Sequence, residues 1–433
     1  MSGSQVDAAL AVIAAQNPVI NAFTDVLADR ARGIVPTPGP LAGVPFAVKN
    51  LFDIVGLPTR AGSLMNRTHP PAAQDATLIE RLEGAGAVLV GALNMGEYAY
   101  DFTGENAHDG PSRNPHDPTR MAGGSSGGSG AAVAAGMVPL ALGSDTNGSI
   151  RVPASFCGVF GLKPTYGRLS RAGTFPFVSS FDHLGPLARS TSLLALAYDA
   201  MQGPDPRDPA QSRRPTEPVS ARLDLGVAGL RMAVAGGYFA RGGAPEANAA
   251  TRMVADALDV TAEIEWPEAA RARAAAYVIT ASEGAALHLD RLRATPELFD
   301  PDTRDRLIAG LAIPAAWVSR AQRFRRWYYD RVCALFENVD LVLAPATPIR
   351  APLLGQKTLE LDGVTVPLRP SLGVYTQPLS FVGLPVAVVP VWPDGGLPIG
   401  VQLIAAPWRE DLVLRAAARL EALGVARVDR GRR

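Results

Sequence analysis

The sequence predicts an α/β protein built around one large mixed β-sheet. Residues 76–95 (ATLIERLEGAGAVLVGALNM) have the pattern of a helix, a glycine turn and a buried strand, which is typical of α/β proteins. Further apolar strand candidates lie toward both ends of the chain, at 41–56, 138–145, 339–345 and 382–391. Because strands from both ends must share the sheet, we expect one domain rather than a string of separate ones.

Helices are predicted at both ends and through the second half of the chain. Residues 4–16 should form a short helix that begins at an N-cap, Ser4, and ends before Pro18. Long helical patterns, some rich in arginine, fill residues 244–335, and a last helix is expected at about 410–423. The segment 203–220 is dense in proline and charge, so it should be a surface loop.

Composition and charge narrow the classes of function. The chain has 41 basic and 41 acidic residues, so no general attraction to nucleic acid or to an anionic membrane is expected. Cys157 and Cys333 stand alone, and no segment resembles a secretory signal or a membrane span. HExxH and clustered Cys/His motifs are absent. We therefore expect a cytoplasmic protein that needs no metal and no cofactor.

The stretch AGGSSGGSGAAVAAG at 122–136 could be a flexible linker, a phosphate loop or the holder of a reactive serine. A linker should join polar segments, but this stretch continues into a small-residue helix pattern and an apolar strand. A phosphate loop of the GxxxxGK[ST] type needs a lysine, and none occurs between residues 50 and 162. The dinucleotide pattern fails as well, because Val133 stands where its last glycine should be. A serine holder is the interpretation that remains.

A reactive serine needs a base, and Lys49 is the outstanding candidate. The chain has only three lysines, and Lys49 lies in the apolar segment GVPFAVKN (43–50). Removal from water disfavours the charged ammonium, which lowers the pKa of a lysine and makes the neutral amine available as a base. The alternative is a lysine that reaches the surface or pairs with a carboxylate such as Asp53. The local sequence leaves both open.

Taken together, these segments resemble the amidase signature family of serine hydrolases. The similar motifs are GVPFAVKN (43–50), AGGSSGGSGAAVAAG (122–136) and GSDTNGSIRVPASFCGVFGLKPT (143–165). With FDHLGPLARS (181–190), LAPATP (343–348) and the segment 383–404, the resemblance runs from about residue 20 to 420. The resemblance implies a large twisted mixed β-sheet covered on both sides by helices. It also implies one domain over 1–433, with a signature core at about 41–200, a helical insertion at about 205–336 and C-terminal strands and a helix at 337–425.

The same resemblance implies a Ser–Ser–Lys catalytic triad. By position, Ser149 is the nucleophile, Ser125 the bridging serine and Lys49 the base, with a cis peptide bond before Ser125. The backbone N–H groups of Thr146, Asn147, Gly148 and Ser149 would form the oxyanion hole. Many family members have glycine where this chain has Asn147. Asp145 and Arg151, close to the nucleophile in sequence, are expected to form a buried structural network.

Within the family, TNGSIRVPASFCG, SFDHLGPLARS and VYTQPLSFVGLP resemble amidohydrolases that act on carboxybiuret, with related ureide and oxamate-type amidases close by. This implies a small, polar, anionic amide as substrate and release of ammonia. An arginine should then meet the substrate carboxylate. Arg369 is the candidate, with Tyr375 and Gln377 nearby, and the alternative that Arg369 is a solvated loop residue stays open.

The resemblance also suggests a small accessory subunit in a heterotetramer. The aromatic, arginine-rich helix at 317–336 could supply the interface for it or could simply pack in the core.

Three other functions stay open. They are the glutaminase component of a glutamine-dependent aminoacyl-tRNA amidotransferase, a general aliphatic or aryl amidase, and a binding protein that uses the same scaffold without catalysis.

Overall fold

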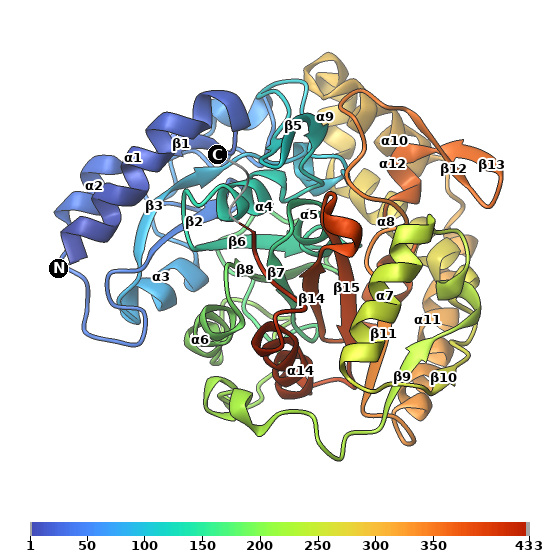
Figure 1. Ribbon diagram of the computed structural model, residues 1–433. Helices are drawn as coiled ribbons and strands as arrows, with labels where there is room; N and C mark the ends of the chain where they lie inside the picture. Colours follow the sequence, from blue (N-terminus) through green and yellow to red (C-terminus); the bar gives the residue numbers. More distant parts are fainter. Residues whose placement is uncertain (1, 430–433) are drawn as a thin grey trace.

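The computed structural model describes residues 2–429, and its centre is one mixed sheet of eleven strands (Figure 1). The strand order is β1-β3-β2-β6-β8-β7-β14-β15-β11-β9-β10. The strands β2, β3 and β6 run parallel, whereas β6, β8, β7, β14, β15 and β11 pair antiparallel. The predicted α/β class with a mixed sheet is therefore confirmed.

The strands of this sheet are β1 (Phe23–Val26), β2 (Pro45–Lys49), β3 (Val88–Leu93), β6 (Leu140–Asp145), β7 (Phe160–Lys163), β8 (His183–Ala188), β9 (Met232–Ala235), β10 (Glu263–Ile264), β11 (Leu341–Pro345), β14 (Val386–Val391) and β15 (Ile399–Ile404). Two small hairpins lie outside it, β4 (Arg113–Asn114) with β5 (Asp117–Met121) and β12 (Thr358–Leu361) with β13 (Val364–Pro367).

The helices are α1 (Ser2–Ile20), α2 (Ala28–Gly33), α3 (Thr77–Gly84), α4 (Gly127–Ala134), α5 (Arg151–Cys157), α6 (Thr191–Met201), α7 (Pro245–Ala257), α8 (Ala269–Leu287), α9 (Leu289–Ala294), α10 (Pro301–Leu311), α11 (Ala315–Leu335), α12 (Leu368–Ser371), α13 (Gln377–Ser380) and α14 (Glu410–Ala422). None of the helices in residues 2–429 has the length and apolar character needed to cross a membrane.

Helices cover both faces of the sheet, which explains the continuous apolar sequence of its central strands (Figure 1). In β2, Phe46 and Val48 pack into one core with α3 and α6, whereas Ala47 points to the opposite face and packs with α1 and α4. Every residue of β2 is buried, including Lys49 at its carboxyl end. The fold thus holds the charged end of this lysine inside the protein.

Two local predictions differ from the structure. Helix α1 begins at Ser2, so Ser4 lies inside it and is not its N-cap, and the helix does not end before Pro18 but continues through it to Ile20. A proline in the last turn removes one backbone hydrogen bond yet leaves little helix beyond it to disrupt. Between 205 and 336, where mainly helices were expected, the strands β9 and β10 extend the edge of the sheet. Both are four residues or shorter, too short to give a clear strand pattern.

Candidate active site

Lys49 lies where two parallel strands end side by side. It is the last residue of β2, and β6, which pairs with β2 in parallel, ends at Ser144 and Asp145. The Lys49 amine donates hydrogen bonds to Ser125 Oγ at 2.6 Å and to Ser144 Oγ at 2.9 Å. Since Lys49 is fully buried, desolvation lowers its pKa to about 7, although Asp145 and other nearby carboxylates oppose this shift. A neutral amine is therefore accessible near neutral pH.

The glycine–serine stretch is packed inside the protein and is not a linker. All residues from 121 to 134 are buried, and the Gly124–Ser125 peptide bond is cis, as the resemblance implied. Helix α4 lies so close to the segment beneath it that a Cβ atom on Gly128 would come within 2.6 Å of the Asn94 carbonyl oxygen. The density of glycine thus allows a close approach of backbones. This approach holds Ser125 against the Lys49 amine.

The segment Thr146–Ser149 connects β6 to α5 and presents a row of free backbone donors. All four residues are buried, and no residue in the described part of the chain accepts a hydrogen bond from their backbone N–H groups. Gly148 has a φ of 144°, and a Cβ atom there would collide with Thr376. Buried donors without partners are rare, so these groups are available to an oxyanion.

A buried ionic network supports the segment Thr146–Ser149 between β6 and α5. Arg151 donates to both carboxylate oxygens of Asp145 at 2.9 Å, and also to Gln402 Oε1 and the Thr376 carbonyl. Although burial disfavours a charged carboxylate, Arg151 and Lys163 hold the pKa of Asp145 at about 2. The predicted structural role of Asp145 and Arg151 is confirmed.

Ser149 opens into a cavity of about 260 Å³, which we call the Ser149 cavity. Its wall includes Asn147, Thr280 and Arg306. Asn147 donates from Nδ2 to Thr280 Oγ1 at 2.9 Å, whereas its Oδ1 atom is buried and has no partner among the described residues. This places an unsatisfied acceptor next to the nucleophile segment.

Two arginines line the Ser149 cavity, and their surroundings differ. Arg369 pairs with Asp101, with Asp302 at 2.9 Å and with Glu105 at 3.6 Å, so its charge is met inside the protein. Arg306 donates to the backbone carbonyls of Tyr100 and Asp302, and no carboxylate of the described residues forms an ion pair with it. Burial lowers the pKa of Arg306, as expected for a cation without a charged partner.

The other two predicted substrate contacts are placed differently from each other. Gln377 lines the Ser149 cavity, and its Oε1 atom accepts a hydrogen bond from Arg273 at 3.0 Å. Tyr375 is fully buried outside the lining of this cavity, and its hydroxyl donates to the Arg241 carbonyl at 2.5 Å.

Among the described residues, no group of three or more His, Cys, Asp or Glu side chains could hold a metal ion.

Sequence reasoning missed Ser144, Thr280 and Arg306. Ser144 lies inside a motif that was recognised, but its contact with Lys49 depends on the pairing of β2 with β6. Thr280 and Arg306 lie on α8 and α10, far from the nucleophile in sequence. No local pattern distinguishes Thr280 and Arg306 from the other threonines and arginines of the chain. They are recognised as site residues only when the fold places them beside the Ser149 cavity.

Comparison with known proteins gives consistent matches along the chain. Residues 5–414 match the family model described as Amidase. The chain is 58% identical to the AtzE component of 1-carboxybiuret hydrolase from Pseudomonas sp. (strain ADP), with 97% of this chain and 94% of that protein covered. It is 38% identical to a glutamyl-tRNA(Gln) amidotransferase component from Chloroflexus aurantiacus (strain ATCC 29366 / DSM 635 / J-10-fl), over 94% and 90%.

A solved structure is also similar to this chain over nearly its full length. It is described as an unexpected vestigial protein complex that reveals the evolutionary origins of an s-triazine catabolic enzyme. Its sequence is 56% identical, the TM-score is 0.97, and the match covers 99% of this chain and 96% of that one.

Proposed function

This chain belongs to the amidase family, and from that premise we propose that it hydrolyses a small anionic ureide of the carboxybiuret type and releases ammonia. The observation that supports this substrate class most directly is the lining of the Ser149 cavity. Within residues 2–429, that cavity combines an arginine that no carboxylate pairs with and a buried acceptor that no donor meets. The relative at 58% identity is part of a 1-carboxybiuret hydrolase, whereas the amidotransferase relative is more distant at 38%.

The proposed mechanism begins at the neutral Lys49 amine. Lys49 takes a proton from Ser125, and Ser125 takes one from Ser149 as Ser149 Oγ attacks the amide carbonyl. The hydrogen bond of 2.6 Å between Lys49 and Ser125 supports the first link of this relay. The segments of the two serines are adjacent as well, because the Ser126 N–H donates to the Ser149 carbonyl at 3.3 Å.

The tetrahedral oxyanion would be held by the backbone N–H groups of Thr146–Ser149. These donors are buried and aligned before the substrate arrives, so little reorganisation is needed during the reaction. Loss of one such donor in a serine hydrolase typically costs about a hundredfold or more in rate. The proton then returns through Ser125 to the departing nitrogen, ammonia leaves, and water hydrolyses the acyl-enzyme by the same relay in reverse.

We propose Arg306 as the group that meets the substrate carboxylate, in place of Arg369. A bound anion near Arg369 would compete with three carboxylates that already surround that side chain. Arg306 donates to backbone carbonyls and stacks over the Tyr100 ring, and no carboxylate of the described residues pairs with it, so a substrate carboxylate would supply its counter-charge. Asn147 Oδ1 can accept a hydrogen bond from a ureide N–H group, which an ordinary aliphatic amide lacks at that place.

A small accessory subunit is the second part of the proposal. The relative with a TM-score of 0.97 was solved as a protein complex. On α11, Trp317 and Trp327 are 56% and 41% exposed, a degree of exposure that is unusual for tryptophan in a monomer. Light scattering of the chain alone, and of the chain co-expressed with a candidate small subunit, tests the assembly.

We further propose a cytoplasmic location, in keeping with the two free cysteines, Cys157 and Cys333.

An ammonia-release screen tests the substrate class. The panel is carboxybiuret, biuret, allophanate, oxamate, malonamate, glutamine and simple aryl amides, compared by kcat/KM. We expect carboxybiuret or a close anionic ureide to give the highest value. A preference for glutamine would instead indicate the amidotransferase function, and a preference for aryl amides a general amidase.

A further inference from the structure

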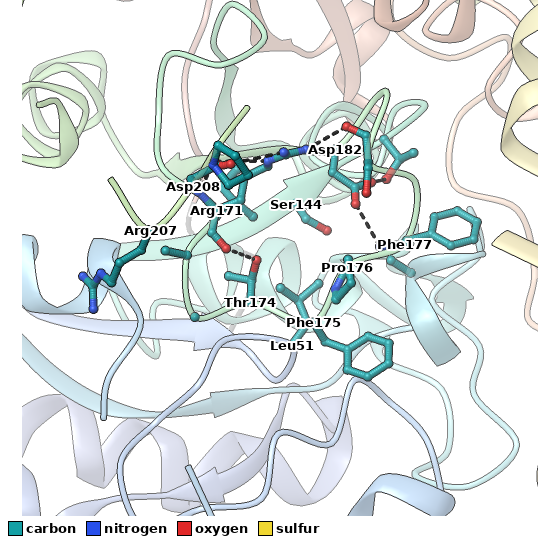
Figure 2. A pocket seen from close by; sticks show the side chains of 17 residues that line it. Leu51, Ser144, Arg171, Thr174, Phe175, Pro176, Phe177, Asp182, Arg207 and Asp208 are labelled. Carbon is teal, nitrogen blue, oxygen red and sulfur yellow. Dashed lines mark hydrogen bonds and ion pairs between the residues drawn. The ribbon is translucent and has the colours of Figure 1, made fainter. Parts of the chain in front are cut away.

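A second cavity lies next to the Ser149 cavity and reaches Ser144, a hydrogen-bond partner of the Lys49 amine. It has a volume of about 360 Å³, and its wall includes Ser144, Arg171, Asp182 and Asp208. We call it the Ser144 cavity. Figure 2 shows Ser144 near its centre, with the Arg171–Asp208 ion pair on one side and Asp182 on the other. The triad does not use this cavity, because Ser125 and Ser149 are not part of its wall.

The two cavities adjoin, and most of their lining residues differ. They share Ala99, Thr146 and Phe177 as a common part of their walls. Thr146 is fixed in this wall because its hydroxyl donates to Asp182 at 2.7 Å, and Asp182 also accepts the Phe177 N–H at 2.8 Å. A substrate that fills the Ser149 cavity would therefore leave the Ser144 cavity open.

The Ser144 cavity reaches the protein surface, and its mixed lining includes charged and hydroxyl side chains. Pro176, Ser179, Arg207 and Pro209 belong to its lining and are exposed. Its lining has two arginines, Arg171 and Arg207, and two carboxylates, Asp182 and Asp208. Arg171 pairs with Asp208, and Asp182 accepts hydrogen bonds from the Thr146 hydroxyl and two backbone N–H groups. Such a lining offers hydrogen-bond partners to water and no net charge to attract an ionic ligand.

The Lys49 amine thus contacts two hydroxyls, and only one of them lines a cavity. It donates to Ser125, the proposed link to the nucleophile, and to Ser144, which lines the Ser144 cavity. We propose that the Ser144 cavity is a proton port, through which the Lys49 amine exchanges protons with solvent by way of Ser144 Oγ while substrate occupies the other cavity.

The exchange step balances with water as the only co-reactant. The Lys49 ammonium gives a proton to Ser144 Oγ, the O–H bond of Ser144 breaks in the same event, and its proton passes to a solvent water to form hydronium. Rotation of the Ser144 hydroxyl restores the starting arrangement, and the reverse sequence protonates the amine.

The need for such a port follows from the charge on Lys49. Burial gives Lys49 a pKa of about 7, so the protonated and neutral forms are both populated near neutral pH. The carboxylates that act on it are Asp145, Asp182 and Asp101, and all favour the protonated form. A protonated Lys49 cannot accept the proton of Ser125. A complex formed in that state can react only after the proton leaves by a route that the substrate does not block.

The port can be tested at Ser144 with two substitutions of nearly equal size. Ser144→Thr keeps the hydroxyl, whereas Ser144→Val replaces it with a methyl group that also keeps water out. Both side chains are β-branched and suit a residue of strand β6. Because the chain has only three lysines, ¹⁵N-lysine labelling gives three side-chain signals, and solvent exchange of the Lys49 ammonium can be followed by NMR at about pH 6.

We expect Ser144→Thr to exchange at nearly the native rate and Ser144→Val to exchange more slowly by about tenfold or more. Ser125→Ala, which interrupts the other route, should change the rate by about twofold at most. Equal rates in the valine and threonine variants, or slow exchange in Ser125→Ala alone, would overturn the proposal. Because the readout is exchange at Lys49 and not turnover, it is independent of whether Ser149 is the nucleophile.

A reversible plug at the rim gives a second test. Ser179→Cys in a Cys333→Ser background places an accessible thiol at the mouth of the Ser144 cavity, while Cys157 is buried and burial raises its thiol pKa. Attachment of a bulky group through a disulfide should slow Lys49 exchange, and its removal by reductant should restore the native rate. Unchanged exchange in the modified protein would contradict a port at this cavity.

Discussion

The Lys49 amine lies 2.6 Å from Ser125 Oγ and is fully buried, so the candidate base and the bridging serine form one enclosed pair. A charged amine is costly in such a place, and the parallel strands β2 and β6 keep it there by holding their carboxyl ends together. The following predictions depend on this pair and on the cavity that Ser149 opens into.

Loss of any member of the proposed triad should abolish most turnover. Ser149→Ala, Ser125→Ala and Lys49→Met should each lower kcat by roughly a thousandfold or more, because the three groups act as a unit. Circular dichroism and thermal unfolding verify that each variant is folded. Ser129→Ala is the matched control, since Ser129 is buried on α4 and its hydroxyl donates to the Leu142 carbonyl, away from the triad. Near-native turnover in folded Ser149→Ala would rule out this nucleophile.

The activity should depend on pH through the base. Because burial holds the pKa of Lys49 near about 7, the fraction with a neutral amine grows as pH rises through that value. We expect kcat/KM to increase up to about pH 8 and then to level off, with one ionisation on the acid side. A profile that is flat between about pH 6 and 8 would mean that Lys49 does not act as the base.

Removal of the buried amine should change how stability depends on pH. The Lys49 pKa is about 7 in the folded protein and near 10.5 in the unfolded chain, so between these values the unfolded chain holds one more proton. This group therefore makes the free energy of unfolding rise with pH by about 1.4 kcal/mol per pH unit across that window. Lys49→Met lacks this contribution. Urea unfolding at several pH values measures the free energy of unfolding of both proteins. The amount by which Lys49→Met exceeds the native protein should shrink as pH rises.

Arg306 and Arg369 should respond differently to substitution. Arg306→Ala should raise KM for anionic ureides by about tenfold to a hundredfold and affect neutral amides little, because it removes a charge-assisted contact. Arg369→Ala should instead lower stability, since it leaves Asp101 buried without its partner. Kinetics on one anionic and one neutral amide, together with melting temperatures, separate the two effects. The reverse pattern would return the substrate contact to Arg369.

Asn147 should select substrates with an N–H group next to the reacting carbonyl. The comparison uses a carboxybiuret-type substrate and its analogue with CH₂ at that place. Asn147→Gly and Thr280→Val should each reduce the preference for the N–H substrate by about tenfold or more, since Thr280 orients the Asn147 amide. An equal loss of kcat/KM for both substrates would show that Asn147 supports the backbone only.

Much of the fold and part of the site could be predicted from local sequence. The apolar residues around Lys49 predicted burial, and the glycines around Ser125 predicted close packing, because both properties depend on near neighbours. The ion pairs of Arg369 could not be predicted in this way. Asp101, Glu105 and Asp302 come from other segments of the chain and meet it only in space.

The short strands β9 and β10 show the same limit for secondary structure. Their few residues extend the sheet because β11 provides a partner, not because they have a strong strand pattern of their own. The role of Ser144 was beyond local sequence for the same reason. Its motif was recognised, but its position between Lys49 and the Ser144 cavity depends on the parallel pairing of β2 with β6.

The most direct test of the central claim is to map a fluorophosphonate adduct by mass spectrometry and to measure its rate of formation against pH. Our account predicts one adduct, on Ser149, with a rate that rises through about pH 7 and falls by roughly a thousandfold in Lys49→Met. An adduct on another residue, or a rate in Lys49→Met equal to that of the native protein, would contradict it.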